Sequence, residues 1–265
     1  MSLFALADLF PAGDYRFHLT LRRAAPEAFF RAQDATGVVL RERRRWLAES
    51  SARHAALTPR GEPVLAELAD RAPHWGLAAP AEAGDVRAWG GMVEPDLLLL
   101  RADAAGEFRL EGGVLCFPTG WALEEKLGGT LDEIHGVVPG LNPALGASIR
   151  QFLQRLKPGV AWLRANWGVA ATEELNMHPA RGLPAPALPL DLRRLWLRVE
   201  EQALVALPRS NGVLFGIRIV LWRMDAVAAE AAAREGLRRA LETMPRALAE
   251  YKRLEAVRAA LVAAL

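Results

Sequence analysis

The chain has 265 residues, with 33 Lys and Arg against 31 Asp and Glu, a formal net charge of +2 and a hydrophobic content of 52%. This near balance of charge excludes the strongly basic surface that nucleic acid or an anionic membrane selects, and a single cysteine excludes an internal disulfide. The apolar runs are far shorter than the roughly 20 residues of a membrane span. We therefore expect a cytoplasmic protein that binds neither nucleic acid nor membrane.

Residues 1–90 are predicted to form a helical and irregular region that packs on the core. Apolar positions among charges indicate a helix over Pro26–Ala48 and a shorter one over Pro63–Ala72. The basic run Arg41–Arg45 lies in the first of these helices. Because the run contains an internal Glu partner, we interpret it as a solvated helix face rather than as a phosphate site.

A regular sheet is predicted to begin after residue 95. Leu97–Leu100 is a fully apolar segment typical of a buried strand, and Glu107–Phe117 predicts one or two more strands. The dipeptide Gly112-Gly113 interrupts the second segment, and paired glycines indicate a turn or a bulge there.

Three short helices are predicted next, over Gly120–Leu127, Thr130–His135 and Asn142–Leu156. The last has the clearest signals in the chain, with Asn142 as N-cap, Pro143 at the first helical position and apolar residues at helical spacing.

Strands return over Val160–Val169, Leu195–Leu204 and Gly212–Trp222. The dipeptide Asn211-Gly212 favours a hairpin between the last two strands.

This order of elements predicts an α+β fold, in which a PAS-like antiparallel sheet and its central helices form the two walls of a pocket. The boundaries divide the chain into an N-terminal region 1–90, a PAS-like core 91–223 and C-terminal helices 224–265. The last part is Ala-rich, with apolar residues at spacings of three and four and a break at Met244-Pro245. It predicts two helices that cover the sheet.

The usual motifs for dinucleotide, ATP, metalloprotease and serine-esterase sites are absent from the sequence. What remains is a series of stretches with unusual composition: Phe117-Pro118-Thr119-Gly120-Trp121, Glu125-Lys126-Leu127-Gly128, Ile134–Gly140, Arg164-Ala165-Asn166-Trp167, Arg198–Leu204 and Phe215-Gly216-Ile217-Arg218. Together, over about residues 8–222, they resemble the heme-dependent oxidative N-demethylase α-subunit family. Agreement at all of these motifs in the same order makes the resemblance specific.

The resemblance implies a PAS-like fold whose pocket binds heme b. It also implies a monooxygenase that uses O2 to remove a methyl group from a small secondary amine as formaldehyde. Electrons are then expected from NADPH, through a separate reductase partner subunit that carries flavin and an iron–sulfur cluster. The alternative interpretation is a PAS-type heme or small-ligand sensor, because PAS-type folds often bind rather than catalyse and a fold does not fix function.

Three positions depart from the family pattern. Thr119 stands where Ser is usual and Val137 where Pro is usual, and both changes are mild. Glu201 stands where the family has Arg, which removes a positive charge near the expected pocket. This third change therefore bears on the substrate more than on the fold.

The resemblance makes His135 the expected axial ligand of the heme iron, since it ends a predicted helix just before a rigid turn that can fix an imidazole. Without the resemblance, a histidine at a helix C-terminus is more simply explained by the helix dipole. His178 is the reserve candidate. The thiol of Cys116 is another possible iron ligand, although a lone cysteine in an apolar strand is more often a small buried hydrophobe.

Arg198, Glu200 and Gln202 alternate along a predicted strand and therefore share one face, which looks either into solvent or into a polar pocket. With the resemblance, Arg198 and Arg218 are expected to contact the heme propionates from paired strands. Glu200 is expected to act in catalysis, as the counter-ion of an ammonium substrate or as a proton donor. Trp167 is expected to belong to the core, or alternatively to cover the heme face or hold a cation.

Overall fold

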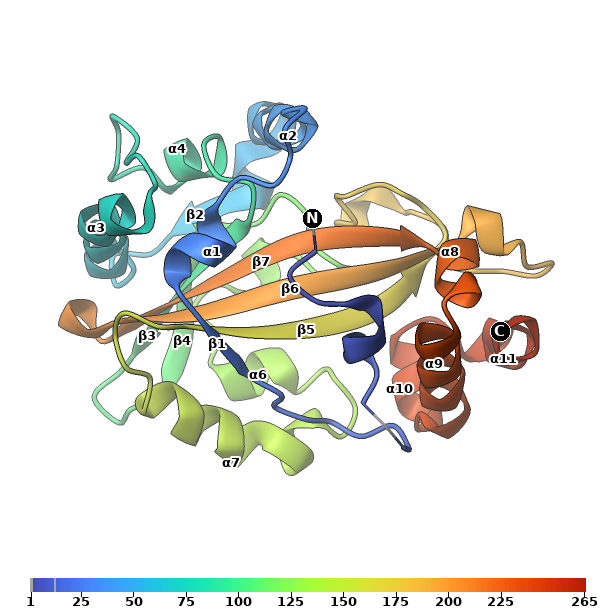
Figure 1. Cartoon of the computed structure of the whole chain (residues 1–265). Helices are drawn as coiled ribbons and strands as arrows, with labels where there is room; N and C mark the ends of the chain where they lie inside the picture. Colours follow the sequence, from blue (N-terminus) through green and yellow to red (C-terminus); the bar gives the residue numbers. More distant parts are fainter. Residues whose placement is uncertain (1, 12) are drawn as a thin grey trace.

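The computed structural model describes residues 2–11 and 13–265. They form an α+β fold around a seven-stranded open antiparallel sheet with the strand order β1-β5-β6-β7-β3-β4-β2. The strands are Arg22–Ala24 (β1), Ala55–Leu57 (β2), Asp96–Ala102 (β3), Phe108–Val114 (β4), Ala161–Ala170 (β5), Trp196–Leu207 (β6) and Gly212–Arg223 (β7). The long strands β5, β6 and β7 cross most of the molecule (Figure 1).

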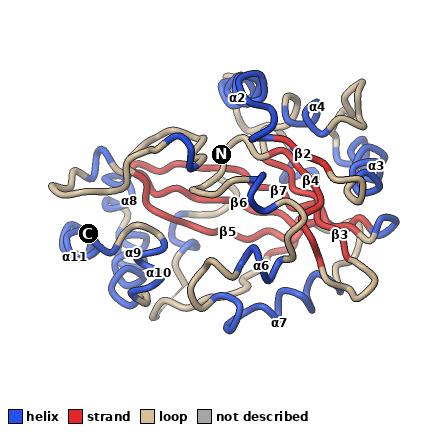
Figure 2. Tube along the Cα trace, turned by 180° about the vertical axis from the view of Figure 1, so that it is seen from behind, coloured by secondary structure: helices blue, strands red, loops and turns tan. Residues whose placement is uncertain are grey.

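Most of the α-helices are short. They are Pro26–Phe30 (α1), Val38–His54 (α2), Glu62–Arg71 (α3), Val86–Gly90 (α4), Leu123–Lys126 (α5), Leu131–His135 (α6), Leu141–Gln154 (α7), Met224–Ala229 (α8), Ala231–Thr243 (α9), Arg246–Tyr251 (α10) and Arg258–Ala264 (α11). Helices α6 and α7 lie together alongside β5, whereas α8–α11 gather at one end of the long strands (Figures 1 and 2). None of these described helices is long and apolar enough to cross a membrane.

Each face of the sheet carries its own hydrophobic core, because side chains alternate along a strand. The smaller core lies toward α7 and joins Leu100 of β3 to Leu153 of α7. The larger core, on the opposite face, includes Phe29 of α1, Leu68 of α3 and Leu237 of α9. The sheet is therefore covered on both sides, and a polar residue on either face is surrounded by protein unless that cover is incomplete.

The central strands confirm most of the predicted sheet. The predicted hairpin is confirmed, because β6 and β7 pair antiparallel and Asn211 between them takes a φ of 54°, the left-handed region that a tight connection requires. The pairing of β3 with β4 shifts register between Leu99 and Leu100, opposite Gly112. This irregularity agrees with the predicted bulge, whereas a turn at that point is wrong because β4 continues to Val114.

The helix predicted over Pro26–Ala48 is instead two helices, α1 and α2. Gly37 breaks the run with a φ of 68°, and the carboxylate of Asp34 accepts a hydrogen bond from the Val39 amide at 2.8 Å, at the start of α2. The two C-terminal helices predicted around Met244-Pro245 are likewise divided into the shorter helices α8 to α11.

Helix α7 begins at Leu141 rather than after Asn142. The Asn142 amide does not cap the helix, since its Nδ2 donates instead to the carbonyl of Asp132 at 2.8 Å. Pro143 is accommodated because it still lies in the first turn, where backbone N–H groups have no helical partner.

The sheet is not confined to residues 91–223. Its two edge strands, β1 and β2, both come from the N-terminal part of the chain and pair with β5 and β4 respectively. Strand β1 covers only one end of β5, because its partners there are Ala161 to Leu163.

Candidate functional site

A cluster of polar side chains lies on the face of the sheet that looks toward α7. We call this cluster the polar face; its members are Arg164 and Asn166 of β5 and Glu200 and Gln202 of β6. In the strand register Arg164 lies opposite Gln202, and Asn166 lies opposite Glu200. Trp162, on the same face, packs edge-on against Phe152 of α7 with 5.8 Å between ring centroids. The polar face therefore continues the smaller hydrophobic core.

The carboxylate of Glu200 is held in place by its neighbours on the polar face. It accepts a hydrogen bond from Gln202 Nε2 at 2.8 Å and a longer one from Asn166 Nδ2 at 3.4 Å. Glu200 and Gln202 are buried, with 8% and 6% of their surfaces exposed, so the interpretation of this face as solvated is wrong. Asn166 is exposed, and the face is open to solvent at that point.

Arg164 is the charged residue on the polar face that lacks a partner. Its Nε is buried without a hydrogen bond, and Gln202 Oε1 opposite it is also buried and unpaired. Burial lowers the pKa of Arg164, and the charge of Glu200 opposes that shift without forming an ion pair among the described residues. The polar face thus presents an unused donor and an unused acceptor next to each other.

His135 lies at the C-terminal end of α6, which begins with a capping box between Thr130 and Glu133. Its ring is half-buried and makes no hydrogen bond to the described residues, 2–11 and 13–265. Burial lowers the pKa of His135, and the charge of Arg164 lowers it further. The imidazole is therefore neutral at neutral pH, the form in which its nitrogen can bind a metal.

Two other segments carry groups whose pKa values respond to the charges of the polar face. Tyr15 and His18 precede β1; burial raises the pKa of Tyr15 and lowers that of His18, and the charge of Arg164 lowers both. Lys252 follows α10, and burial of its ammonium group lowers its pKa to about 8, an effect that the charge of Glu200 opposes. The charges of Glu200 and Arg164 thus act on groups from both ends of the chain.

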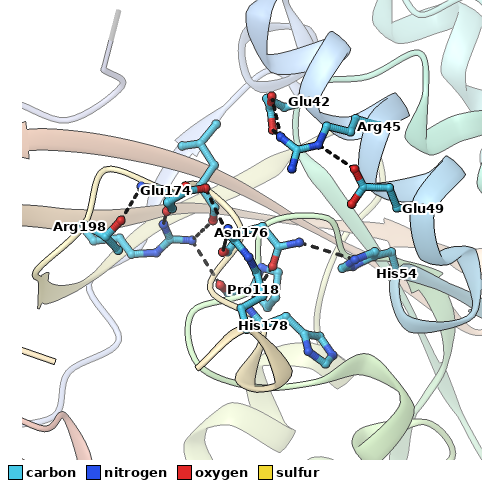
Figure 3. A network of polar contacts seen from close by, with 12 residues as sticks. Glu42, Arg45, Glu49, His54, Pro118, Glu174, Asn176, His178 and Arg198 are labelled. Atoms are coloured by element: carbon cyan, nitrogen blue, oxygen red, sulfur yellow. Dashed lines mark hydrogen bonds and ion pairs between the residues drawn. The ribbon is translucent and has the colours of Figure 1, made fainter. Parts of the chain in front are cut away.

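Arg198 is on the same side of β6 as Glu200, but its guanidinium is fully engaged elsewhere. It donates to Thr119 Oγ1 at 2.9 Å and to four backbone carbonyls, those of Phe117, Pro118, Glu174 and Leu175, at 2.7 to 3.3 Å. Figure 3 shows the side chain reaching toward Pro118 and Glu174. Arg198 therefore joins two loops, one after β4 and one after β5, at the end of the polar face.

Arg218 lies on the opposite face of the sheet, since it is paired with Glu201 and not with Glu200. Its guanidinium forms a buried ion pair with Glu94 and donates to the carbonyls of Phe29 and Arg31. The expectation that Arg198 and Arg218 contact the propionates of one heme from paired strands is wrong, because the two side chains are on different sides of the sheet.

His178, the reserve ligand, has both ring nitrogens occupied. Nδ1 accepts from the Ala180 amide at 3.2 Å, so Nε2 carries the proton and donates to Glu124 at 3.1 Å. Its ring stands edge-on to that of His54, 5.8 Å away, in the network of Figure 3. Burial raises the pKa of the remaining candidate, the thiol of Cys116, to about 12, which keeps it protonated and unsuited to thiolate ligation.

Trp167 points away from Glu200, into the larger core. Its ring meets that of Phe10 edge-on at 5.3 Å. It also holds a cation, because Lys252 Nζ lies 5.3 Å from the Trp167 ring and donates to the Trp167 carbonyl at 2.7 Å. That carbonyl belongs to the part of β5 beyond the end of β1, so Lys252 satisfies an acceptor on the open edge of the sheet.

Glu201, where the sequence departs from the family pattern, also faces away from Glu200. Its Oε1 accepts hydrogen bonds from the Ser2 hydroxyl and the Leu3 amide, both at 2.6 Å. The expectation that this change alters the charge near the polar face is wrong, because the carboxylate fastens the N-terminal segment on the other side of the sheet.

Hollows of two sizes occur among the described residues. One of about 460 Å³ opens on the surface between β2 and the start of α4, and its charged lining residues, Asp85 and Arg87, pair with each other. The other, of about 20 Å³, lies beside β5 between Tyr15, His18 and Trp167. In the described part of the chain no group of three or more His, Cys, Asp and Glu residues could hold a metal ion by itself.

These features define an α+β protein with a buried polar patch on its sheet and a neutral, unpaired imidazole on a neighbouring helix. Residues 74–262 match the model of the family described as haem-dependent oxidative N-demethylase, alpha subunit-like. Because the match covers more than half of the 265 residues, the chain belongs to this family. The family's name implies heme and an enzyme of more than one kind of subunit, and the matched range includes the polar face, His135 and Lys252.

Sequence reasoning missed Arg164 and Lys252 as candidate functional residues. Arg164 had a signal, because it alternates with Asn166 in a Trp-rich strand that was singled out as a motif. Lys252 had none: a single lysine in an Ala-rich helical region looks like any solvated residue, and only its position over Trp167 distinguishes it.

Proposed function

We propose that this chain binds heme b between its polar face and α6, and that it removes a methyl group from a small secondary amine as formaldehyde. Family membership supports the reaction class. The observation that carries the proposal is the neutral, unpaired imidazole of His135, which stands close enough to the unpaired Arg164 for that charge to shift its pKa.

A PAS-like architecture is part of the proposal. The five central strands run in the order β5-β6-β7-β3-β4, and α5, α6 and α7 all lie in the chain between β4 and β5. This arrangement supports a sheet that forms one wall of a pocket and helices that form the other.

The residues present fit a heme group. Heme iron would be held by a neutral imidazole nitrogen, and His135 offers one. The propionates need cationic donors, which the polar face offers in Arg164. When bound, heme would supply the activation of O2, for which a separate reductase subunit with flavin and an iron–sulfur cluster would provide the electrons of NADPH.

The chain itself orients and neutralises the substrate. Hydrogen bonds from Gln202 and Asn166 fix the carboxylate of Glu200, and Gln202 Oε1 remains a free acceptor. A secondary amine is an ammonium ion at neutral pH, so Glu200 serves as its counter-ion and Gln202 Oε1 accepts a second hydrogen bond. Glu200 can also take the proton that the amine must lose.

The experiment is an absorption spectrum of purified protein after reconstitution with hemin, followed by formaldehyde release from dimethylamine with NADPH and the reductase. Wild type should show a Soret band and turn over. His135→Ala should lose or strongly weaken heme retention, whereas the exposed His74→Ala should not. Glu200→Gln should retain heme but lose roughly 10- to 100-fold in catalytic efficiency, as expected for a lost charged contact.

Each outcome has one meaning. Absence of a Soret band contradicts heme binding. If His135→Ala keeps the heme ligation of the wild type, another residue binds the iron. Heme binding without formaldehyde release, with an active reductase, favours a heme sensor over an enzyme, and unchanged kinetics per heme in Glu200→Gln removes Glu200 from the site.

A further inference from the structure

We infer that Arg164, and neither Arg198 nor Arg218, binds a carboxylate of the ligand on the polar face; on the function proposed above, that carboxylate is a heme propionate. The inference rests on the hydrogen-bond partners of Arg164 on β5, Arg198 on β6 and Arg218 on β7. Only Arg164 has none among the described residues.

The other two arginines are committed to the protein. Arg198 already donates to five acceptors on two loops, and freeing it would leave the backbone carbonyls of Phe117, Glu174 and Leu175 without partners among the described residues. Arg218 is paired with Glu94 on the opposite face of the sheet. A ligand on the polar face cannot reach Arg218, and it can use Arg198 only by breaking those contacts.

Arg164, in contrast to Arg198 and Arg218, has no hydrogen-bond acceptor among the described residues. A guanidinium carries five donors in a planar fork that matches the two oxygens of a carboxylate, and leaving such a group partly buried without an acceptor is costly. The carboxylate whose charge acts on Arg164, that of Glu200, is held by Gln202 and Asn166 instead. The folded chain therefore keeps a cation ready for an acceptor that it does not itself provide.

The charge of the surroundings also selects an anion. Arg164 forms no ion pair among the described residues, and the carboxylate of Glu200 accepts hydrogen bonds from Gln202 and Asn166. A ligand carboxylate on Arg164 therefore supplies the counter-charge that Glu200 does not, and it leaves Glu200 available for an ammonium ion.

The test compares hemin with hemin dimethyl ester, in which both propionates are uncharged, by titration of the heme-free protein. Wild type should bind hemin about 10- to 100-fold more tightly than the ester, which corresponds to one charge-assisted contact. Arg164→Met should lose most of this preference, and Arg164→Lys should keep part of it. Arg155→Met, an exposed arginine at the end of α7, is the matched control and should behave as wild type.

Thermal unfolding of the heme-free proteins provides a readout that does not depend on activity. Because Arg164 Nε is buried without a partner, Arg164→Met should melt at or above the wild-type temperature, whereas an arginine with a structural role would melt lower when replaced. An unchanged preference for hemin in Arg164→Met overturns the inference while heme binding stands. Failure of wild type to bind hemin overturns the proposed function, and the propionate contact with it.

Discussion

Replacing Arg198 by alanine tests whether this side chain is a structural clamp. Its guanidinium donates to the Thr119 hydroxyl and to four backbone carbonyls over distances of 2.7 to 3.3 Å. Hydrogen bonds to charged groups contribute about 1.5–3 kcal/mol each, but contributions from one network do not add. We expect Arg198→Ala to lower the free energy of unfolding by about 3–5 kcal/mol, as is typical when one partner of a buried charged network is removed.

The measurement is urea denaturation followed by circular dichroism, with a thermal melt as a second readout. At about 2–4 °C per kcal/mol for a chain of this size, the melting temperature should fall by roughly 6–20 °C. Arg193→Ala is the control, because Arg193 is 74% exposed and pairs with Asp191 on the surface; its effect should stay within about 0.5 kcal/mol. A loss below about 1 kcal/mol in Arg198→Ala would refute the clamp and return Arg198 to the candidates for ligand binding.

Two more predictions concern stability. Burial lowers the pKa of His54 below 6.5, so the unfolded chain binds a proton before the folded chain does, and the free energy of unfolding should fall as the pH drops below 6.5. His54→Asn keeps the donor to the Leu115 carbonyl and should flatten this pH dependence by at most about 1.4 kcal/mol per pH unit, measured by urea titrations at several pH values. Equal slopes in the wild type and the variant would contradict the assignment to His54. A methyl group on Gly113, at a φ of 151°, would lie 2.4 Å from the Leu97 carbonyl oxygen. Gly113→Ala should therefore destabilise the chain by at least about 2 kcal/mol, whereas Gly84→Ala, with open space around it, should be nearly neutral.

The five central strands could be predicted from the sequence because their signals are local, whereas the short edge strands β1 and β2 could not. The period of two along β6 placed Arg198 and Glu200 on one face, and the strand register confirms it. The start of α7 could not be predicted, since Asn142 follows a capping rule in the sequence but meets the Asp132 carbonyl in the fold. A local rule gives way where a distant acceptor becomes available.

The hydrogen-bond and ion-pair partners of the charged residues could not be predicted from the sequence. Arg198, Arg164 and Arg218 look alike as strand residues, yet one is a clamp, one is unpaired and one is an ion pair on the other face. These differences depend on carbonyls and carboxylates brought from loops far along the chain. Periodicity predicts the direction in which a side chain points, but not what it meets there.

Glu201 shows how independently two neighbours on one strand can evolve. Its carboxylate is tied to Ser2 and Leu3, whereas Glu200 belongs to the opposite side of the sheet. A substitution at position 201 therefore acts first on the attachment of Ser2 and Leu3 to the sheet and leaves the contacts of Glu200 in place. A change next to Glu200 in the sequence can thus alter only how the N-terminal segment is held.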